Sequence, residues 1–444
     1  MSRCFPFCCF LTLLTLAATA AAQDEDVNRQ TAVGNKPERV QWFSGLGFGM
    51  FVHWSLDSQI GSVISHSLVG ADEAYCRRYF EELPKTFHPR RFDPGEWADL
   101  ARLAGMRYVV FTAKHHSGFC MFDTKTTDFS IMNTPYQKDI TREVIEAFRS
   151  RGVAVGLYFS PDDFYFLYKQ GIPIGRKQPG VTPQENPDLL RYDQAQLREL
   201  MTNYGPIDIV FLDGPAEGLR EVCWQCQPDV VVTRGAMETP EQHIPGKPIP
   251  APWEACMTMG TQWQFKPTNE SYKSGAQLIE RLIETRAKGG NFLLNVGPEP
   301  DGPLPPEQSG RLREIALWYF VNQEAVLDVE PWTVVNDGNI WYTQRKSDDG
   351  RSTVYAMITQ PDWKWGARKE FLLASVRAGE HTQVYVLGQT GKVLEYRPGA
   401  DVTARWEQKP DGLHVSAVRA QRLYNDRAWP NPVVLKITDA RANP

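Results

Sequence analysis

The stretch Ile207-Asp208-Ile209-Val210-Phe211-Leu212-Asp213-Gly214-Pro215 decides the fold of this chain. Five of the six residues before Asp213 are apolar, a pattern typical of a strand that is buried on both faces. Asp213 therefore follows the carboxyl end of the strand, which is the end where α/β barrels carry their reactive groups. An Asp-Gly pair is also ordinary turn chemistry, so Asp213 on its position alone is either catalytic or structural.

Other buried strands run into polar residues in the same way. Such strands are predicted at 47–52, 108–113 and 153–159, and they lead into His53-Trp54, Lys114-His115-His116 and Ser160-Pro161-Asp162-Asp163. The carboxyl ends of neighbouring parallel strands meet at one edge of a sheet, so these residues are expected to form a single site.

Strands alternate with amphipathic helices from about residue 41 to residue 330. Further strands are predicted at 230–233, 255–259 and 291–297, which with the stretch at 207–212 gives seven, and helices are predicted at 93–104, 139–150, 191–203, 275–287 and 307–321. The pattern predicts an α/β fold with a (β/α)8-like, TIM-type catalytic barrel over 41–330. No clean eighth strand is found, which leaves room for an irregular barrel.

The pattern changes after residue 330. Short apolar runs at 341–343, 354–358, 383–387, 392–396, 412–415 and 433–437 are separated by Gly, Asp and Pro. Such spacing is typical of antiparallel strands, and it predicts a C-terminal β-sandwich domain over 331–444.

The first 22 residues have the composition of a secretory signal peptide. Arg3 supplies the positive charge, residues 4–16 are apolar, and residues 17–22 are small, with cleavage expected near Gln23. We expect residues 23–40 to be a loosely ordered extension. No later segment has the length of a transmembrane helix, so export without a transmembrane segment is predicted, into the periplasm, the medium or a lysosome-like compartment.

The net charge and the cysteine content argue against certain partners and cofactors. The net charge of -5 over 444 residues argues against nucleic-acid binding. Five cysteines remain after residue 22, and Cys223-Trp-Gln-Cys226 could be a local disulfide, half of a zinc site or a redox pair. Neither a second such pair nor a nearby His cluster completes a zinc site, so buried thiols with at most one local bridge are favoured, and no metal or cofactor is expected.

Two glutamates complement Asp213. Glu241 lies in a polar, Pro-rich loop, while Glu254 has Trp253 and an apolar flank beside it, which suggests partial burial and a hydrogen-bonding role. One carboxylate at a rigid strand end and another on a mobile loop form a workable glycosidase arrangement, in which the first attacks the sugar and the second protonates the leaving oxygen. Aromatic side chains near the barrel mouth could stack on sugar faces, although core packing is the commoner use of Trp: Trp42, Trp54, Phe211, Trp253 and Trp263.

Several strings in this region together resemble a known family. They are Gly49–Trp54, Ala113–Phe119, Thr127–Phe129, Gly156–Ser160, Phe211–Gly214, Pro252–Glu254 and Lys288–Pro298. In order and spacing they resemble α-L-fucosidases of glycoside hydrolase family 29, over roughly residues 41–330. The C-terminal sandwich is also what that family usually carries.

The resemblance implies retaining hydrolysis of terminal α-L-fucose through a covalent fucosyl-enzyme intermediate. Asp213 matches the family's nucleophile. The acid/base, which is less regular in the family, matches Glu241, with Glu254 as the fallback. Residues that match positions gripping the fucose are His53, Glu73, His115, His116, Tyr158 and Arg234; with Trp54, Phe211, Trp253 and Glu254 they form the candidate substrate-binding set.

The chain departs from the family pattern at two places. Many relatives have Trp where this chain has Phe211, and Glu-Trp-Tyr where it has Glu73-Ala74-Tyr75. The loss of these indoles thins the aromatic wall, which bears on linkage preference and affinity more than on the reaction.

Three alternatives stay open from the sequence. One is a metal-dependent barrel hydrolase that uses His53, His115 and His116, although the chain lacks the usual His-x-His spacing. A second is a fucose-binding protein without catalysis, and a third is an enzyme that hydrolyses α-L-galactosides. The expected partner is a fucosylated glycan, and a homo-oligomer is compatible with the sequence.

Overall fold

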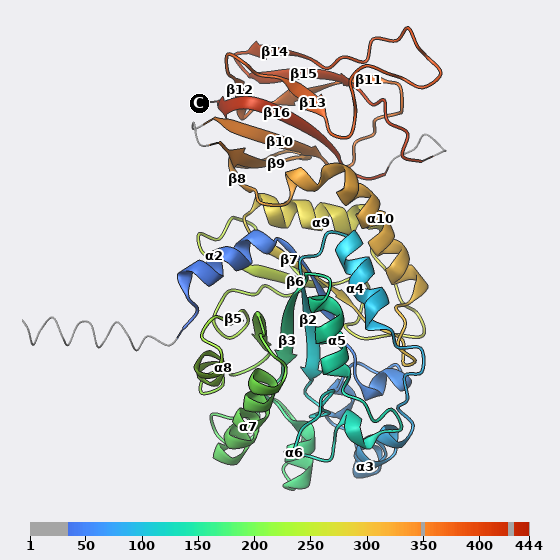
Figure 1. Cartoon of the computed structure of the whole chain (residues 1–444), viewed down its shortest axis with the longest axis vertical. Coiled ribbons are helices and arrows are strands. Elements are labelled where there is room, and N and C mark those ends of the chain that lie inside the picture. Colours follow the sequence, from blue (N-terminus) through green and yellow to red (C-terminus); the bar gives the residue numbers. More distant parts are fainter. Residues whose placement is uncertain (1–33, 348–350, 425–429, 444) are drawn as a thin grey trace, which may run out of the picture. The chain divides into compact units, whose positions relative to one another are not determined.

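A curled parallel sheet forms the N-terminal part of the protein (Figure 1). The structure is a computed structural model that describes residues 34–347, 351–424 and 430–443. The sheet order is β5-β4-β3-β2-β1-β7-β6. The bounds are β1 Phe48–Val52, β2 Tyr108–Lys114, β3 Ala154–Phe159, β4 Ile209–Leu212, β5 Val231–Val232, β6 Glu254–Thr258 and β7 Asn291–Val296. The prediction of an irregular TIM-like barrel is confirmed, whereas the predicted signal peptide lies outside the described residues.

Both faces of these strands are buried, as their continuous apolar runs predict. Phe51 of β1 and Phe211 of β4 point to an inner cluster, which also holds Tyr108 and Tyr158. Their chain neighbours, such as Val210, belong to the larger outer cluster under the helices. Successive side chains of a strand point to opposite faces, so one face fills the barrel and the other packs against helices.

Helices cover the outer face of the sheet (Figure 1). Several begin where a side chain caps the first turn: Asp93, Asp139, Asp163, Asn186 and Ser274 accept hydrogen bonds from free backbone N–H groups at the starts of α4, α5, α6, α7 and α9. The bounds are α2 Pro37–Leu46, α3 Glu73–Glu81, α4 Pro94–Leu103, α5 Ile140–Arg149, α6 Phe164–Lys169, α7 Pro187–Asn203, α8 Arg220–Cys226, α9 Gly275–Ala287 and α10 Pro306–Asn322.

These helices bear on two predictions made from the sequence. Helix α2 begins inside the segment 23–40, so the prediction of a loosely ordered extension is wrong for residues 37–40, where Pro37 starts the first turn. None of the helices in the described part of the chain is both long and apolar enough to cross a membrane.

An irregular segment takes the place of an eighth strand. The backbone N–H groups of Glu254 and Cys256 donate to the carbonyls of Glu238 and Pro240, and the N–H of Gln242 donates to the carbonyl of Cys256. Residues 238–242 therefore run parallel to β6. Pro240 has no N–H to continue a ladder, which explains why the sequence shows no clean strand here.

Two antiparallel sheets make up the C-terminal part of the chain. One has the order β12-β16-β10-β9-β8 with β13 on β16, and the other has the order β11-β15-β14. The bounds are β8 Glu330–Asp337, β9 Ile340–Lys346, β10 Ser352–Ile358, β11 Arg368–Leu373, β12 Val376–Ala378, β13 Val384–Val386, β14 Arg405–Lys409, β15 Gly412–Val418 and β16 Val433–Ala442. The strand predicted at 392–396 is wrong: the N–H of Arg397 donates to the carbonyl of Leu394 in a turn, and Tyr396 has a φ of 63°.

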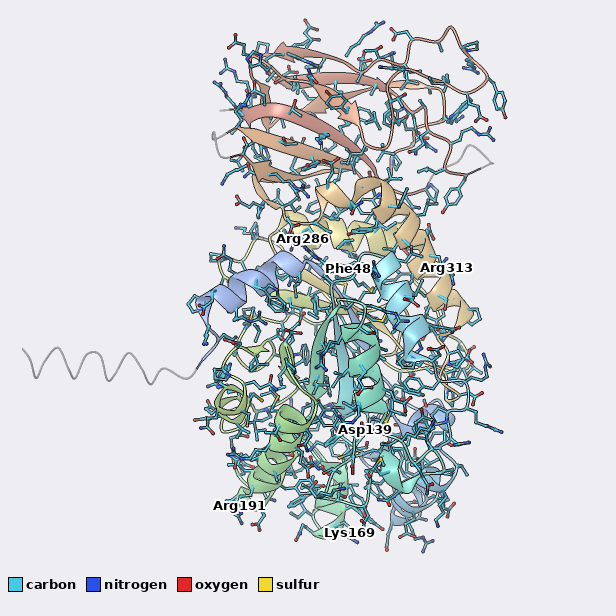
Figure 2. All side chains as sticks on the ribbon, in the orientation of Figure 1. Phe48, Asp139, Lys169, Arg191, Arg286 and Arg313 are labelled. Carbon is cyan, nitrogen blue, oxygen red and sulfur yellow. The ribbon has the colours of Figure 1, made fainter. Side chains whose placement is uncertain are left out.

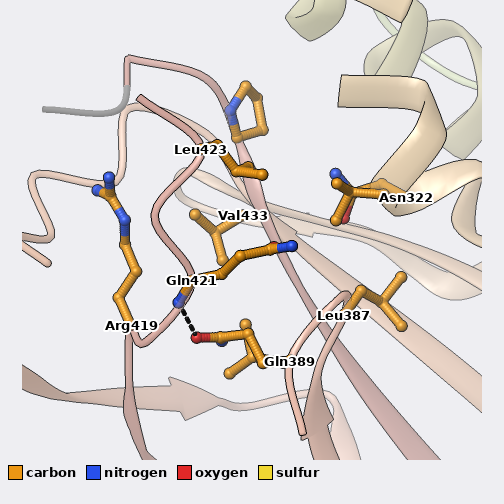
Figure 3. Close-up of a pocket in the computed structure, with 10 residues that line it drawn as sticks. Asn322, Leu387, Gln389, Arg419, Gln421, Leu423 and Val433 are labelled. Atoms are coloured by element: carbon orange, nitrogen blue, oxygen red, sulfur yellow. Dashed lines mark hydrogen bonds between the residues drawn. The ribbon is translucent and has the colours of Figure 1, made fainter. Parts of the chain in front are cut away.

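A small pocket lies between the end of α10 and the C-terminal strands (Figure 3). Asn322, Leu387, Leu423 and Val433 contribute to its wall, and the N–H of Gln421 donates to Oε1 of Gln389 at 2.9 Å across one side. The residues that line it include no carboxylate, thiol or imidazole. We therefore do not take this pocket as a reaction site.

A buried ion cluster fixes the carboxyl end of β2. Lys114 Nζ lies 2.7 Å from Asp193 of α7 and 3.2 Å from Asp163, which caps α6, and all three side chains are fully buried. The cluster thus ties β2 to two helices of the crossover between β3 and β4, directly beside His115 and His116.

Replacing Lys114 by Met is expected to lower the free energy of unfolding by about 3–5 kcal/mol, because the buried side chains of Asp163 and Asp193 lose the ammonium group that both of them contact. Urea unfolding at neutral pH measures the loss. The matched control is Lys125→Met, whose side chain is 81% exposed beside Asp123 and should matter by less than about 0.5 kcal/mol. Equal losses in the two variants would contradict the assignment of a stabilising role to the cluster.

Candidate active site

A pocket opens at the carboxyl ends of the parallel strands. It gathers eight of the residues predicted for the site from segments far apart in sequence: His53, His115, His116, Tyr158, Phe211, Asp213, Arg234 and Glu241. The remaining wall is made by Phe51, His66, Arg176, Cys256 and Trp263. The polar ends of β1, β2, β3 and β4 therefore form one site, as the shared strand end predicts.

Asp213 directly follows β4 and is held by two hydrogen bonds. Its carboxylate accepts from the Tyr158 hydroxyl at 2.7 Å and from Arg234 Nη1 at 2.8 Å. Burial alone would raise the pKa of Asp213, but the charge of Arg234 and these two hydrogen bonds outweigh it, so the pKa is lowered. Asp213 is therefore ionised at neutral pH, as a nucleophile or an electrostatic group requires.

Arg234 joins the two candidate catalytic carboxylates. The same Nη1 atom that donates to Asp213 also donates to Glu241 Oε2 at 2.9 Å. The two carboxylate oxygens can therefore be no farther apart than the sum of these distances, 5.7 Å. Carboxyl groups about 5–5.5 Å apart are typical of retaining glycosidases, whereas inverting enzymes need about 6.5–9.5 Å.

Arg234 is itself held in place by its surroundings. Its Nε donates to Thr239 Oγ1 and its Nη2 to the Thr239 carbonyl, both at 3.1 Å. The guanidinium carbon also lies 4.7 Å from the centre of the Phe211 ring. These contacts hold the guanidinium in the wall of the pocket, next to Phe211.

Glu241 is the more accessible of the two carboxylates. Its side chain is 43% exposed, against 21% for Asp213. Its loop is paired with the sheet at this point, because the backbone N–H of the next residue, Gln242, donates to the carbonyl of Cys256 in β6. Glu241 thus combines a defined position with access to water, which suits a group that exchanges protons with solvent.

Each of the three predicted histidines is held through its Nδ1 atom. His53 lies 2.6 Å from Asn295 Oδ1, His115 lies 2.8 Å from Ser65 Oγ, and His116 lies 2.6 Å from Ser160 Oγ. Burial lowers the pKa of all three rings, that of His53 to about 4, so they are neutral at neutral pH. Within the described residues no group of three or more His, Cys, Asp or Glu side chains is arranged to hold a metal ion.

Comparison with known proteins decides the family. Residues 14–324 match the family model described as alpha-L-fucosidase. The chain belongs to the α-L-fucosidase family, glycoside hydrolase family 29. It is 29% identical to a tissue alpha-L-fucosidase of Rattus norvegicus over 86% of this chain and 90% of that protein, and 27% identical to the plasma alpha-L-fucosidase of the same species over 85% and 87%.

Solved structures of the family share the fold. Alpha-L-fucosidase isoenzyme 1 from Paenibacillus thiaminolyticus superimposes with a TM-score of 0.70 at 26% identity, covering 90% of this chain and 98% of that chain. A GH29 fucosidase from Bacteroides thetaiotaomicron, at 22% identity, has a TM-score of 0.69 over 93% of this chain and 99% of that chain. This second structure is of a covalent intermediate trapped with 2-fluoro-fucosyl fluoride.

Trp54 and Glu73 are two predicted sugar contacts that the structure places elsewhere in this fucosidase-family chain. Trp54 follows His53 and points to the opposite face, where it packs in the core against aromatic rings including Phe87 and Trp97. Glu73 starts α3 and lines a separate groove next to the site. The prediction that Trp54 and Glu73 contact the fucose is therefore corrected.

Trp253 and Glu254 lie at the amino end of the barrel, away from Asp213. The Trp253 ring covers Gly290 so closely that a Cβ there would come within 2.4 Å of it. Glu254 is the first residue of β6, is fully buried, and accepts a hydrogen bond from the Tyr108 hydroxyl at 2.5 Å. Because reactive groups belong at the opposite strand ends, the fallback assignment of Glu254 as acid/base and the sugar contact of Trp253 are both corrected.

Glu254→Gln tests this placement through pH. Burial raises the pKa of Glu254 to about 7, so the folded chain keeps a proton that the unfolded chain loses near pH 4.5. The contribution of Glu254 to stability is thus full below pH 4.5 and falls as the pH rises to 7. Gln cannot ionise. The free energy of unfolding of the variant, relative to that of the wild type, should therefore rise by about 2–3 kcal/mol from pH 4.5 to pH 8.

Urea unfolding of both proteins at the two pH values measures this gain. Turnover by Glu254→Gln should change by less than about threefold, against about 10²- to 10⁴-fold for loss of a proton-transferring residue. The assignment would be refuted if the difference in unfolding free energy between the variant and the wild type were the same at both pH values. A loss of turnover of about 10²-fold or more would refute it as well.

His66 and Arg176 are wall residues that the sequence did not reveal. The His66 ring lies 5.2 Å from that of His116, and Arg176 Nε donates to Asp162 at 2.6 Å. Both lie in the long crossovers that follow β1 and β3, where no strand pattern fixes a position. Their only signal is the length of these crossovers, because long loops at the carboxyl ends of barrel strands often build the site.

Proposed function

We propose that this protein is a retaining exo-α-L-fucosidase with Asp213 as nucleophile and Glu241 as acid/base. The observation that supports it best is that Arg234 Nη1 donates to both carboxylates. The two accepting oxygens are therefore at most 5.7 Å apart. This separation leaves no room for the water that an inverting enzyme places between sugar and base. Membership of the α-L-fucosidase family supports terminal α-L-fucose as the sugar.

The first step forms an ester between the sugar and Asp213. A carboxylate oxygen of Asp213 attacks the anomeric carbon, the bond from this carbon to the glycosidic oxygen breaks, and protonated Glu241 gives its proton to that oxygen. In the second step Glu241 takes a proton from a water molecule whose oxygen attacks the same carbon and displaces Asp213. Two inversions return fucose with its original anomeric configuration.

The remaining wall can recognise the sugar. His53, His115 and His116 are neutral, so each ring can donate or accept a hydrogen bond to a hydroxyl group. Phe211 and Trp263 supply apolar surface for a deoxysugar. Hydrolysis of α-L-galactosides, the second candidate activity, differs in requiring room for a hydroxyl group at C6.

The test uses the purified protein and 4-nitrophenyl α-L-fucoside. We expect release of fucose whose first-formed anomer, followed by NMR, is α, and labelling of Asp213 by 2-fluoro-fucosyl fluoride, located by peptide mass spectrometry. No fucose release would favour the non-catalytic binding protein. A β-anomer, or a label on another side chain, would overturn the mechanism.

Export and assembly belong to the proposal as well. We propose that residues 1–22 direct export and are removed, which N-terminal sequencing of the mature protein tests. Light scattering of the purified protein tests whether it forms a homo-oligomer.

A further inference from the structure

Two imidazole rings of the pocket, those of His53 and His115, are neighbours whose centres lie 5.7 Å apart. His53 directly follows β1 and His115 directly follows β2, so both lie at the carboxyl ends of the strands. Figure 2 shows Phe48, where β1 begins, on the side of the barrel opposite Lys169, at the end of α6. Each ring bonds to the protein through Nδ1, which leaves Nε2 as the atom that can meet a ligand.

The partner of Nδ1 decides what Nε2 can do. Burial lowers the pKa of both rings, so each is neutral and carries a single ring hydrogen. If that hydrogen is on Nδ1, then Nε2 is an acceptor, and if Nδ1 accepts a hydrogen bond, then Nε2 is a donor.

The partner of His53 is an oxygen that can only accept. Nδ1 lies 2.6 Å from Asn295 Oδ1, and Nδ2 of the same amide donates to the backbone carbonyl of Trp263 at 2.6 Å. The opposite orientation of the amide would turn Oδ1 towards that carbonyl and leave two acceptors facing each other. His53 Nδ1 therefore carries the hydrogen, and His53 Nε2 is an acceptor.

The partner of His115 is a buried hydroxyl that must donate. Ser65 Oγ lies 2.8 Å from His115 Nδ1 and accepts a hydrogen bond from the backbone N–H of Ser117 at 2.9 Å. Among the described residues this hydroxyl has no third partner, so its own hydrogen has His115 Nδ1 as its acceptor. If Nδ1 donated instead, a buried O–H would be left without an acceptor, which is unfavourable. The hydrogen of His115 is therefore on Nε2.

The backbone around Ser65 is held for this contact. Ser65 has a φ of 59°, in the left-handed region that few residues other than glycine adopt. Its N–H donates to the buried carboxylate of Asp57 at 2.8 Å. Such a conformation persists where the surrounding structure imposes it, as it often does at functional sites.

We propose that Asn295 and Ser65 are positioning residues that hold the two rings in opposite tautomers. The pocket then presents an acceptor, His53 Nε2, beside a donor, His115 Nε2. Two adjacent free hydroxyl groups of one sugar can complete a directed chain of hydrogen bonds from the donor to the acceptor, in which each hydroxyl accepts once and donates once. The identity of this sugar rests on the proposed fucosidase activity, whereas the tautomers do not depend on it.

Nitrogen-15 NMR of the purified protein, labelled at its 8 histidines, reads the tautomers directly. Protonated and unprotonated ring nitrogens have well separated shifts, and the signals are assigned by their loss in His53→Gln and in His115→Gln. At neutral pH we expect the hydrogen on Nδ1 of His53 and on Nε2 of His115. The same tautomer in both rings, or the two reversed, would overturn the proposal without any change to Asn295 or Ser65.

Asn295→Leu tests the first positioning residue. A buried Nδ1–H without an acceptor is unfavourable, so the hydrogen of His53 should move to Nε2, while the spectrum of His115 stays unchanged. With the acceptor lost, kcat/KM on 4-nitrophenyl α-L-fucoside should fall about tenfold. The matched control is Asn322→Leu, which removes a buried asparagine of α10 bonded to the carbonyl of Trp318. It should leave both tautomers unchanged and kcat/KM within about twofold.

Ser65→Ala tests the second positioning residue. The Nδ1 shift of His115 should move towards that of a nitrogen without a hydrogen bond, while the signals of His53 stay in place. Ser67→Ala, which removes a half-buried hydroxyl of the same loop, should change neither ring.

Three results would contradict the proposal. They are an unmoved His53 tautomer in folded Asn295→Leu, an unmoved His115 Nδ1 shift in folded Ser65→Ala, and unchanged kcat/KM in an Asn295→Leu variant whose tautomer has moved. Failure of the proposed function itself looks different, because the wild type would then release no fucose even with the rings in opposite tautomers.

Discussion

Replacing Asp213 by Ala is expected to lower kcat on an aryl α-L-fucoside by about 10⁴-fold or more, the scale reached when an enzyme loses its nucleophile. Such a loss adds about 5 kcal/mol to the barrier. The physical reason is that Asp213 is the half-buried carboxylate that Tyr158 and Arg234 keep ionised. Without it the anomeric carbon has no group to attack it within the pocket.

Added azide should restore part of this activity. A small anion can occupy the space left by the carboxylate and attack the anomeric carbon, which gives fucosyl azide of inverted configuration when the aryl group leaves. Product analysis by NMR and mass spectrometry identifies the azide. The control is Asp229→Ala, an exposed carboxylate paired with Lys36, which should keep full activity. Undiminished turnover by Asp213→Ala would remove this residue from the mechanism.

Replacing Glu241 by Ala should lower kcat/KM by an amount that depends on the leaving group of the substrate. Fucosides with poor leaving groups depend on protonation of the departing oxygen and should lose about 10²- to 10⁴-fold in kcat/KM. Activated aryl fucosides, whose phenolate leaves without a proton, should lose far less. Steady-state assays on a series of aryl and alkyl fucosides give this dependence directly.

Glu238→Ala is the matched control for Glu241. Glu238 is an exposed carboxylate of the same segment, and only its backbone carbonyl takes part in the pairing with β6. Its loss should leave activity on both classes of substrate within about twofold, as for other surface changes away from a site. If Glu241→Ala lowered turnover equally on poor and activated leaving groups, another residue would have to be the proton donor.

The strands and the polar residues at their ends could be predicted because burial on both faces leaves a continuous apolar run. This pattern located Asp213 and the histidines, whereas Tyr158, which lies within β3, was indicated only by the family resemblance. It could not tell that Trp54 turns outward while His53 turns inward, since alternation reverses with a shift of one residue.

Residues outside the regular elements were less accessible to prediction. His66 and Arg176 reach the pocket from crossovers whose path depends on tertiary packing. The false strand at 392–396 has the correct composition, but nothing in a short apolar run shows whether a neighbouring strand is available to pair with it. Glu254 directly precedes the strand predicted at 255–259, and the register with β7 shows that it is the first residue of β6, at the amino end of the barrel.

The nucleophile and the proton donor are held by different kinds of structure, and this difference affects how easily each can change during evolution. The nucleophile sits at the end of a full strand, whose register cannot change without rebuilding the sheet. The proton donor is held by a few backbone hydrogen bonds, so lengthening or shortening the turn between Arg234 and Glu241 could re-aim it at a different glycosidic oxygen. Changes of linkage preference are therefore most accessible by insertions and deletions in this turn.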